Sequence, residues 1–230
     1  MRRMFLGLCV LSIVAAGIVP ELAGAHSQAP RLTIAIGPNP VTEDQPVTIS
    51  GRLYGPHHAH TVVVLWGRKI GARRFNRYDA TVTDAQGRYS LSERLRLNHL
   101  WYVTARGLQS PIVLQRVRAG VLLLSSQVNV PPGVSLTLAG GVAPSHAGER
   151  IVIQQLRVGG WQIIAHARLD RRSRFSIKHA FSSNSTPKLR AFLEADSENS
   201  SSASPQITLS VNGIYFIKHI VIIMQENRSF

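Results

Sequence analysis

The sequence predicts an all-β chain that contains two consecutive sandwich domains. The first observation is an internal repeat of about 90 residues, in which the same short patterns recur in the same order. The second is an alternation of apolar and polar residues with a period of two, which is typical of strands with one face on a core. The third is the punctuation of these stretches by turns rich in Gly, Pro, Asn and Asp, with no sustained helical stripe.

The repeat is carried by short groups that differ in composition and keep their order. The matched positions are Ser50-Gly51 with Ala139-Gly140, Pro56-His57-His58-Ala59 with Pro144-Ser145-His146-Ala147, Asp84 with Asp170, Arg88-Tyr89-Ser90 with Arg174-Phe175-Ser176, and Ser110-Pro111 with Ser204-Pro205. The spacing between matched groups drifts by a few residues, as expected when insertions fall in loops.

Each repeat has the size and strand content of an immunoglobulin-like β-sandwich, which is about 100 residues long. We place the first at residues 31–121 and the second at 122–211. Phe75 and Trp161 occupy equivalent places in the two copies, so each is expected to plug the space between its two sheets. The Ser-rich stretch Ser197–Ser204 is expected to be a flexible loop inside the second repeat.

The N-terminal residues have the three parts of an export signal. Arg2 and Arg3 form the positive region, Met4–Val19 is apolar, and Ala23-Gly24-Ala25 is a cleavage site of small residues, so residues 1–25 are predicted to be a signal peptide. The general secretory and twin-arginine routes both fit, and the mature protein is expected in the periplasm, outside the cell or on its surface. Cys9 is the only cysteine, which leaves no thiol for a disulfide or thiolate site after cleavage.

The stretch 217–230 differs from the repeats in composition. Apolar side chains, mostly Ile and Val, dominate from Ile217 to Met224, which is typical of a strand buried on both faces of a parallel sheet. Glu226 and Asn227 follow at the carboxyl end of this strand, where functional groups collect in open α/β sheets. Their oxygens suit a divalent cation, and a solvated turn explains the same pair.

The string KHIVIIMQENRSF resembles the opening motif of the bacterial phosphoesterases that include non-specific phospholipases C and acid phosphatases, within the alkaline-phosphatase-like superfamily. The resemblance implies that Glu226 and Asn227 contribute to a metal centre that holds a divalent metal ion in the complete enzyme. It also implies hydrolysis of phosphate esters, such as phospholipids, with a nucleophile downstream. Residues 212–230 are then a linker and the truncated start of a phosphoesterase domain, and this chain alone is expected to be inactive and to bind no metal stably.

A non-enzymatic interpretation stands beside this one. Two immunoglobulin-like repeats also fit a secreted or cell-surface binding or adhesion protein. The stretches Val47–Leu53 and Thr83–Ser90 resemble bacterial surface-type immunoglobulin-like modules, which supports the fold and says little about function. The sequence does not indicate the oligomeric state.

Charge and histidines add two weaker signals. With 26 Lys and Arg against 12 Asp and Glu, the formal net charge is +14, which favours loose contact with an anionic cell-surface polymer or lipid headgroups. No signature of a nucleic-acid-binding fold accompanies the Arg residues, so no specific nucleic acid is expected. His57, His58 and His60 are close enough to suggest zinc or copper, but only His146 recurs in the second repeat, which favours a structural turn.

Overall fold

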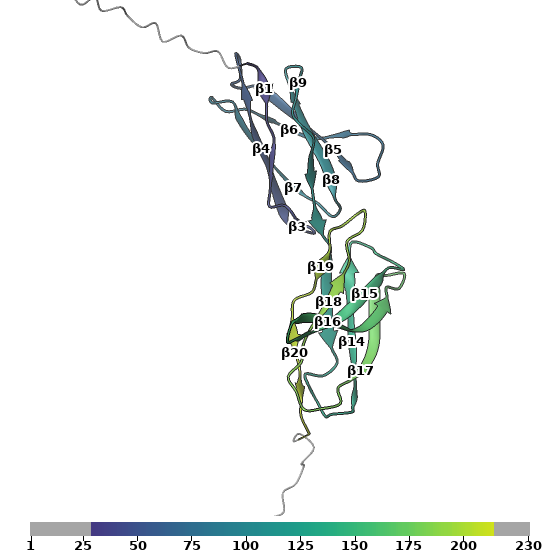
Figure 1. Cartoon of the computed structure of the whole chain (residues 1–230). Helices are drawn as coiled ribbons and strands as arrows, with labels where there is room; N and C mark the ends of the chain where they lie inside the picture. The colour runs from purple at the N-terminus through teal and green to yellow at the C-terminus, as the bar shows by residue number, and fades with distance from the viewer. Residues whose placement is uncertain (1–28, 214–230) are drawn as a thin grey trace, which may run out of the picture.

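The computed structural model describes residues 29–213 as two β-sandwiches arranged end to end (Figure 1). The first sandwich contains β1 (Arg31–Leu32), β2 (Ala35–Gly37), β3 (Val41–Thr42), β4 (Pro46–Tyr54), β5 (Val62–Lys69), β6 (Asn76–Val82), β7 (Arg88–Arg94), β8 (His99–Ala105), β9 (Leu108–Gln109), β10 (Val113–Gln115) and β11 (Val117–Arg118). The second contains β12 (Gly120–Ser125), β13 (Asn129–Val130), β14 (Ser135–Ala143), β15 (Arg150–Arg157), β16 (Gly160–Arg168), β17 (Arg174–Ala180), β18 (Lys188–Leu193), β19 (Ser202–Ala203), β20 (Ile207–Thr208) and β21 (Ser210–Val211). Within residues 29–213, no helix has the length and apolar character needed to cross a membrane.

The two sandwiches share one topology. In the first, β4 pairs with β1, β2 and β7 in one sheet, while the other sheet has the order β10-β8-β5-β6 with β9 also on β8. In the second, β12-β14-β17 faces β16-β15-β18, and β19 and β20 both pair with β18. Each sandwich also has one short parallel pair, β3 with β11 and β13 with β21. This arrangement confirms the predicted immunoglobulin-like fold.

The sequence repeat corresponds to repeated hydrogen bonding. One carboxylate oxygen of Asp84 accepts from the backbone N–H groups of Gln86 and Arg88, both at 2.8 Å. The equivalent oxygen of Asp170 accepts from Arg172 at 2.8 Å and Arg174 at 2.9 Å. The matched residues therefore close the same turn before β7 and before β17.

Each sandwich has its own apolar core. The buried members of the first are Leu32, Val41, Val47, Ile49, Leu53, Val63, Leu65, Tyr89, Leu91, Leu95, Trp101, Val103, Ala105 and Val117. Those of the second are Ala119, Val121, Leu123, Val130, Leu136, Leu138, Val142, Ile151, Ile153, Leu169, Phe175, Phe181, Leu189, Ala191, Leu193, Leu209 and Val211. Most come from alternate positions of the predicted strands, whose other side chains face away from the core.

The predicted aromatic plugs are wrong. Phe75 and Trp161 are only partly buried, and each lies beside a cation: Phe75 is 5.0 Å from the guanidinium carbon of Arg68 and Trp161 is 4.2 Å from that of Arg190. They are placed outside the cores because both lie at hairpins that extend from the sandwich. The fully buried plug of the first sandwich is Trp101 on the central strand β8.

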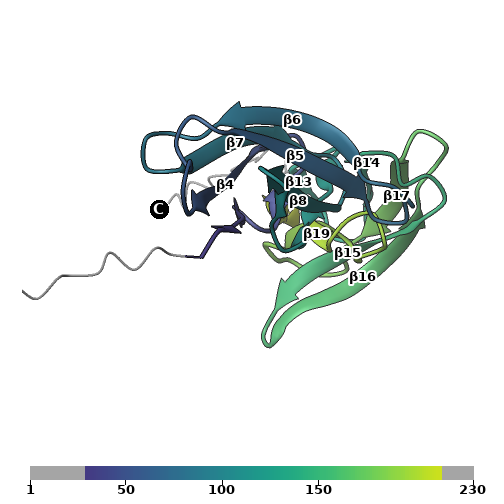
Figure 2. The ribbon, with the colours of Figure 1, turned by 90° about the horizontal axis from the view of Figure 1, so that it is seen from above.

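The second sandwich is turned about the long axis relative to the first. In the view along that axis, the equivalent hairpins β5–β6 and β15–β16 point in different directions (Figure 2). The connection is short, since only Ala119 separates β11 from β12. That residue is 1% exposed, so the crossing between the domains is itself buried.

The prediction of a flexible loop at Ser197–Ser204 is also wrong. Asn199 is 1% exposed and Ser202 lies in β19, paired with Leu193 of β18. The loop is held because it packs against the first sandwich, a contact that its polar composition does not reveal.

Candidate functional site

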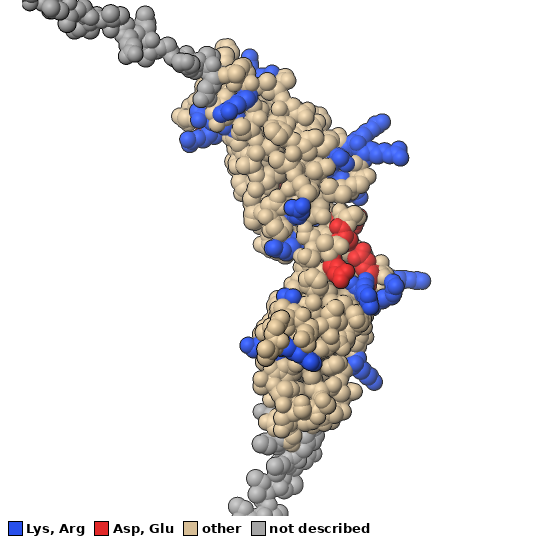
Figure 3. Space-filling view, viewed as in Figure 1, with Lys and Arg blue, Asp and Glu red and all other residues tan. Residues whose placement is uncertain are grey.

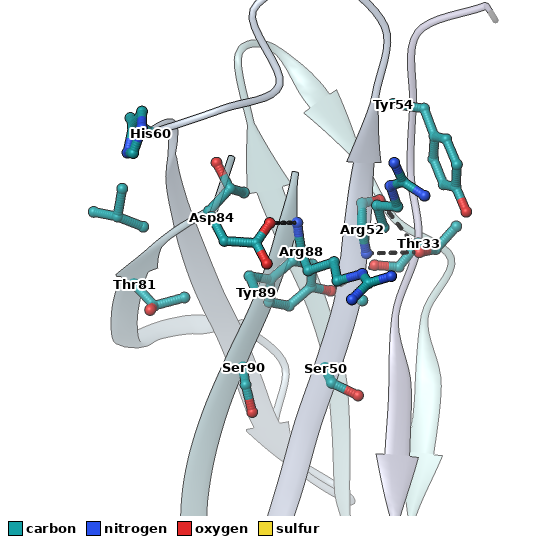
Figure 4. Close-up of a pocket in the computed structure, with 13 residues that line it drawn as sticks. Thr33, Ser50, Arg52, Tyr54, His60, Thr81, Asp84, Arg88, Tyr89 and Ser90 are labelled. Carbon is teal, nitrogen blue, oxygen red and sulfur yellow. Dashed lines mark hydrogen bonds between the residues drawn. The ribbon is translucent and has the colours of Figure 1, made fainter. Parts of the chain in front are cut away.

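A pocket of about 980 Å³ opens on the first sandwich beside β4, β6 and β7 (Figure 4). Its lining consists of Thr33, Ser50, Gly51, Arg52, Tyr54, His60, Thr81, Val82, Thr83, Asp84, Arg88, Tyr89 and Ser90. Most of these side chains are polar, and Arg52 and Arg88 carry positive charge. The carboxylate of Asp84 lies in the same lining, so the pocket carries charges of both signs.

Most polar groups of this pocket are engaged in the fold. Arg52 Nε donates to the carbonyl of Gln86 at 2.8 Å, and the Tyr89 hydroxyl donates to the carbonyl of Thr33 at 2.5 Å. Burial raises the pKa of the Tyr89 hydroxyl well above its usual value, so this group stays a protonated donor at neutral pH. The guanidinium of Arg52 also lies 5.0 Å from the ring of Tyr54. These contacts fix the shape of the pocket within the fold.

The residues predicted for the metal centre lie elsewhere. Glu226 and Asn227, like the signal peptide and the rest of 214–230, lie outside the described residues. The histidine turn is described, and its geometry favours the structural interpretation: His58 Nδ1 lies 2.8 Å from the carbonyl oxygen of Gly55. The carbonyl of His58 in turn accepts from the Thr83 hydroxyl at 2.6 Å.

Within residues 29–213, a different set of side chains is close enough together to hold a metal ion. One ligand atom from each of His146, Glu149 and Asp196 lies within 4.8 Å of the others. His146 and Glu149 are ends of one tight turn, since the Glu149 N–H donates to the His146 carbonyl at 3.1 Å. Asp196 belongs to the loop between β18 and β19.

Acidic groups concentrate around this cluster. In the space-filling view, acidic side chains gather at the narrow neck between the sandwiches, whereas Lys and Arg are scattered in small groups (Figure 3). Burial and then the neighbouring carboxylate of Asp196 raise the pKa of Glu149, and Glu198 adds to the same effect. The field at this point favours a cation although the chain as a whole is basic.

The loop that carries Asp196 also forms the joint between the domains. The Asn98 N–H donates to the carbonyl of Glu198 at 2.6 Å, and the Ser200 N–H donates to the carbonyl of Val117 at 2.8 Å. Two buried amide side chains complete the joint. The Val117 N–H donates to Asn98 Oδ1 at 2.7 Å, and Asn199 Nδ2 donates to the same Val117 carbonyl at 3.2 Å.

Asn199 also reaches into the first sandwich. Its Nδ2 donates to the carbonyl of Arg96 at 2.9 Å, in the loop between β7 and β8. The guanidinium of Arg96 pairs with Glu43 at 3.0 Å. Hydrogen bonds from both domains therefore fix the last strand of the first sandwich at the point where the chain enters the second.

Sequence reasoning missed Glu149, Asp196, Asn98 and Asn199. The two acidic residues are 47 residues apart in the sequence, so no local spacing connects them. The only available signal was the recurrence of His146 opposite His58, which by itself indicates a shared turn.

No protein-family model and no curated protein matches this chain. Among solved structures, the chain is similar to a tetra-tandem repeat from the extending region of a large adhesion protein, with 14% identity, 80% of this chain and 50% of that chain covered, and a TM-score of 0.38. It is also similar to the D0-D1 domain of intimin, with 7% identity, 77% and 96% covered, and a TM-score of 0.32. The chain thus spans half the length of the first of these structures, and the immunoglobulin-like assignment rests on its own strand pairing.

Proposed function

We propose that the two sandwiches form a non-catalytic extracellular spacer that holds whatever precedes Ala29 at a fixed distance and orientation from whatever follows Gly213. The observation that carries the proposal is the joint, where Val117 is bonded by Asn98 from one side and by Asn199 and Ser200 from the other. A hinge would require these buried groups to lose their partners, at a cost of about 1–3 kcal/mol each.

The positions of the described ends support the same function. β1 and β20, which are near the two ends of the described part of the chain, lie towards opposite ends of the elongated molecule (Figure 1). Two domains arranged end to end with a hydrogen-bonded joint keep the two ends of the segment at a constant distance and orientation, as a spacer or presenting segment requires. The extracellular location rests on the predicted signal peptide of residues 1–25.

Electron paramagnetic resonance between two spin labels tests the spacer. Labels at Arg106→Cys and Ser182→Cys, exposed positions in the first and second sandwich, are introduced into a Cys9→Ser chain that has no other thiol. We expect one narrow distance distribution. The pair Asn98→Ala and Asn199→Ala is expected to broaden it because both amide bridges are lost.

An exposed asparagine provides the control. Asn76→Ala removes an amide from β6, away from the joint, and is expected to leave the distribution narrow. A broad distribution in the unaltered joint would show a flexible tether and would contradict the spacer.

A second candidate is that the spacer is the accessory region of a secreted metal-dependent phosphoesterase. It is supported by the string KHIVIIMQENRSF at 218–230, and it assigns Glu226 and Asn227 to a metal centre acting on phosphate esters or phospholipids. The reading frame after Phe230 is the test. In the family that this string resembles, the motif continues with an Asp and a Tyr-Phe-Gly turn. These residues are therefore expected there, and a frame without them excludes this parent.

A surface partner is proposed for the pocket of the first sandwich. Arg52 and Arg88 line it, and Arg31 lies 4.1 Å from the Tyr54 ring at its edge. We expect weak binding to vesicles containing phosphatidylglycerol that is largely lost at about 0.5 M salt, where exposed charges are screened. Arg52→Gln with Arg88→Gln is expected to weaken binding more than Arg73→Gln with Arg74→Gln, which removes the same charge from exposed positions outside the pocket. Equal effects would mean that net charge alone acts.

A further inference from the structure

The side chain of His146 is oriented as metal-ligating histidines are. Its Nδ1 lies 2.8 Å from the carbonyl oxygen of Pro144, which only accepts, so Nδ1 carries the hydrogen. The backbone N–H of His146 donates to the Ser173 hydroxyl at 2.7 Å and fixes the residue from behind. A histidine whose Nδ1–H is held by a carbonyl presents its Nε2 lone pair to a metal.

The opposite nitrogen is buried and has no hydrogen-bond partner. The His146 side chain is 1% exposed, and Nε2 makes no hydrogen bond. The nearest carboxylate oxygen, Asp196 Oδ2, lies 3.4 Å away. A buried acceptor without a donor costs free energy, which a bound cation between these atoms would recover.

The carboxylate of Asp196 is also held in place. Its Oδ1 accepts from the backbone N–H groups of Glu198 at 2.7 Å and Asn199 at 2.6 Å. These two bonds occupy one oxygen and leave Oδ2 directed at His146. The third group, the Glu149 carboxylate, is partly exposed and completes the cluster from the turn that carries His146.

We propose that His146 Nε2 and the carboxylates of Glu149 and Asp196 form a binding site for a divalent transition-metal ion of the Zn²⁺ class. One imidazole and two carboxylates match the nitrogen and oxygen ligands of Zn²⁺, with a fourth position for water. Ca²⁺ prefers six to eight oxygen ligands and Mg²⁺ retains most of its water, so neither fits a buried imidazole as well.

The site lies next to the joint. Binding joins the turn at 146–149 to the loop at 196–199, and the same loop supplies Glu198 and Asn199 to the first sandwich. The metal therefore stiffens the joint from the second domain, a consequence that rests on the proposed spacer function. Metal binding itself does not depend on that function.

Titration calorimetry of the full chain without an affinity tag, with ZnCl₂, tests the site. We expect one Zn²⁺ ion to bind per chain at this site, and Glu149→Gln and Asp196→Asn each to weaken it by at least about tenfold. Asn at position 196 retains an oxygen for the two backbone bonds, so this variant keeps the loop. Glu194→Gln, an exposed carboxylate of the same loop, is the matched control and is expected to bind as the parent does.

Two outcomes would overturn the site. Absence of Zn²⁺ binding would mean that His146 and Asp196 form an ion pair alone. Binding unchanged by Glu149→Gln and Asp196→Asn would place the metal on other histidines, such as those at 57–60. Displacement of Zn²⁺ by an equal concentration of Ca²⁺ would overturn the metal class.

Amide hydrogen exchange tests the effect on the joint separately. Zn²⁺ is expected to slow exchange of the Asn98 and Ser200 amides, which bond across the domains, and to leave the Ser110 amide within the first sandwich unchanged. Bound Zn²⁺ with unchanged exchange at Asn98 and Ser200 would overturn the stiffening. The spin-label distances in the metal-free chain test the spacer independently of both results.

Discussion

Gly51 and Gly140 hold equivalent positions, and in each sandwich a neighbouring segment passes close to the glycine. A Cβ atom at Gly140 would clash with the carbonyl oxygen of Leu122 and lie 2.8 Å from Cζ of Phe175. A Cβ atom at Gly51 would clash with the carbonyl oxygen of Thr33. The recurrence of this glycine is a packing requirement, because the opposing backbone is held in place: Leu122 is paired with β14, and the Thr33 N–H donates to the Arg52 carbonyl at 3.0 Å.

Gly140→Ala is expected to lower the free energy of unfolding of the second sandwich by about 1–3 kcal/mol through overpacking. Denaturant unfolding followed by circular dichroism measures the change. Gly141→Ala is the matched control, because its Cβ would lie 3.2 Å from the nearest atom, the carbonyl oxygen of Ser173. Equal losses in the two variants would contradict a clash that is specific to Gly140, since the backbone entropy of the unfolded chain favours Ala over Gly in both.

At the scale of elements, a serine hydroxyl in each sandwich accepts a hydrogen bond from the backbone of a central strand, β8 or β18. The Ala191 N–H of β18 donates to Ser204 Oγ at 3.0 Å, and the Ser204 N–H donates back to the Ala191 carbonyl at 2.9 Å. Val103 of β8 and Ser110 exchange the same two bonds, both at 3.0 Å. The Ser-Pro pair of the repeat therefore interrupts the pairing with the central strand, between β9 and β10 on β8 and between β19 and β20 on β18, since Pro has no N–H for a ladder bond.

Ser204→Ala is expected to destabilise the second sandwich by about 1–3 kcal/mol, because the buried Ala191 N–H loses its acceptor. Thermal unfolding measures the loss, and Ser201→Ala, an exposed position three residues earlier, is expected to change little. A neutral Ser204→Ala would mean that water or a shifted backbone replaces the hydroxyl.

The strands were well predicted from the sequence, and the aromatic contacts between sheets were not. Period-two alternation identifies one-sided strands because successive side chains point to opposite faces. Trp101 is not identified from the sequence because the burial of its ring depends on the neighbouring strand. The ring lies over Gly67 of β5, where a Cβ atom would clash with it. That complementarity arises only when β5 and β8 are paired.

At the scale of the whole molecule, one histidine in each sandwich links folding to pH. Burial, followed by the positive charge of Lys69, lowers the pKa of His99, against an opposing effect of the Leu97 carbonyl. Burial alone lowers the pKa of His179. Both folded-state pKa values lie below the usual 6.5, so the unfolded chain binds more protons. Stability is then complete above about pH 6.5 and falls as the pH drops towards the folded-state values.

The free energy of unfolding is expected to be lower at about pH 5.5 than at about pH 7.5. His99→Gln with His179→Gln should reduce this difference, which denaturant unfolding at the two pH values measures. The carboxyl pKa of Glu93, raised by burial and by Asp79, acts in the opposite direction near pH 4.5, so the comparison stays above pH 5. An unchanged pH dependence in the double variant would contradict the assignment to these histidines.

The sequence by itself determined the two-domain repeat, the strands and the turns, because these depend on period-two alternation and on local residues such as Asp84 and Asp170. Only the tertiary structure decided the joint and the cluster of His146, Glu149 and Asp196. The joint and the cluster each bring together side chains that are distant along the chain. Their chemistry depends on how deeply these side chains are buried and on which hydrogen-bond partners they contact. The local sequence carries no signal for such contacts. The Ser-rich loop 197–204 is therefore predicted to be flexible from its composition, whereas in the structure it is hydrogen-bonded to the first sandwich.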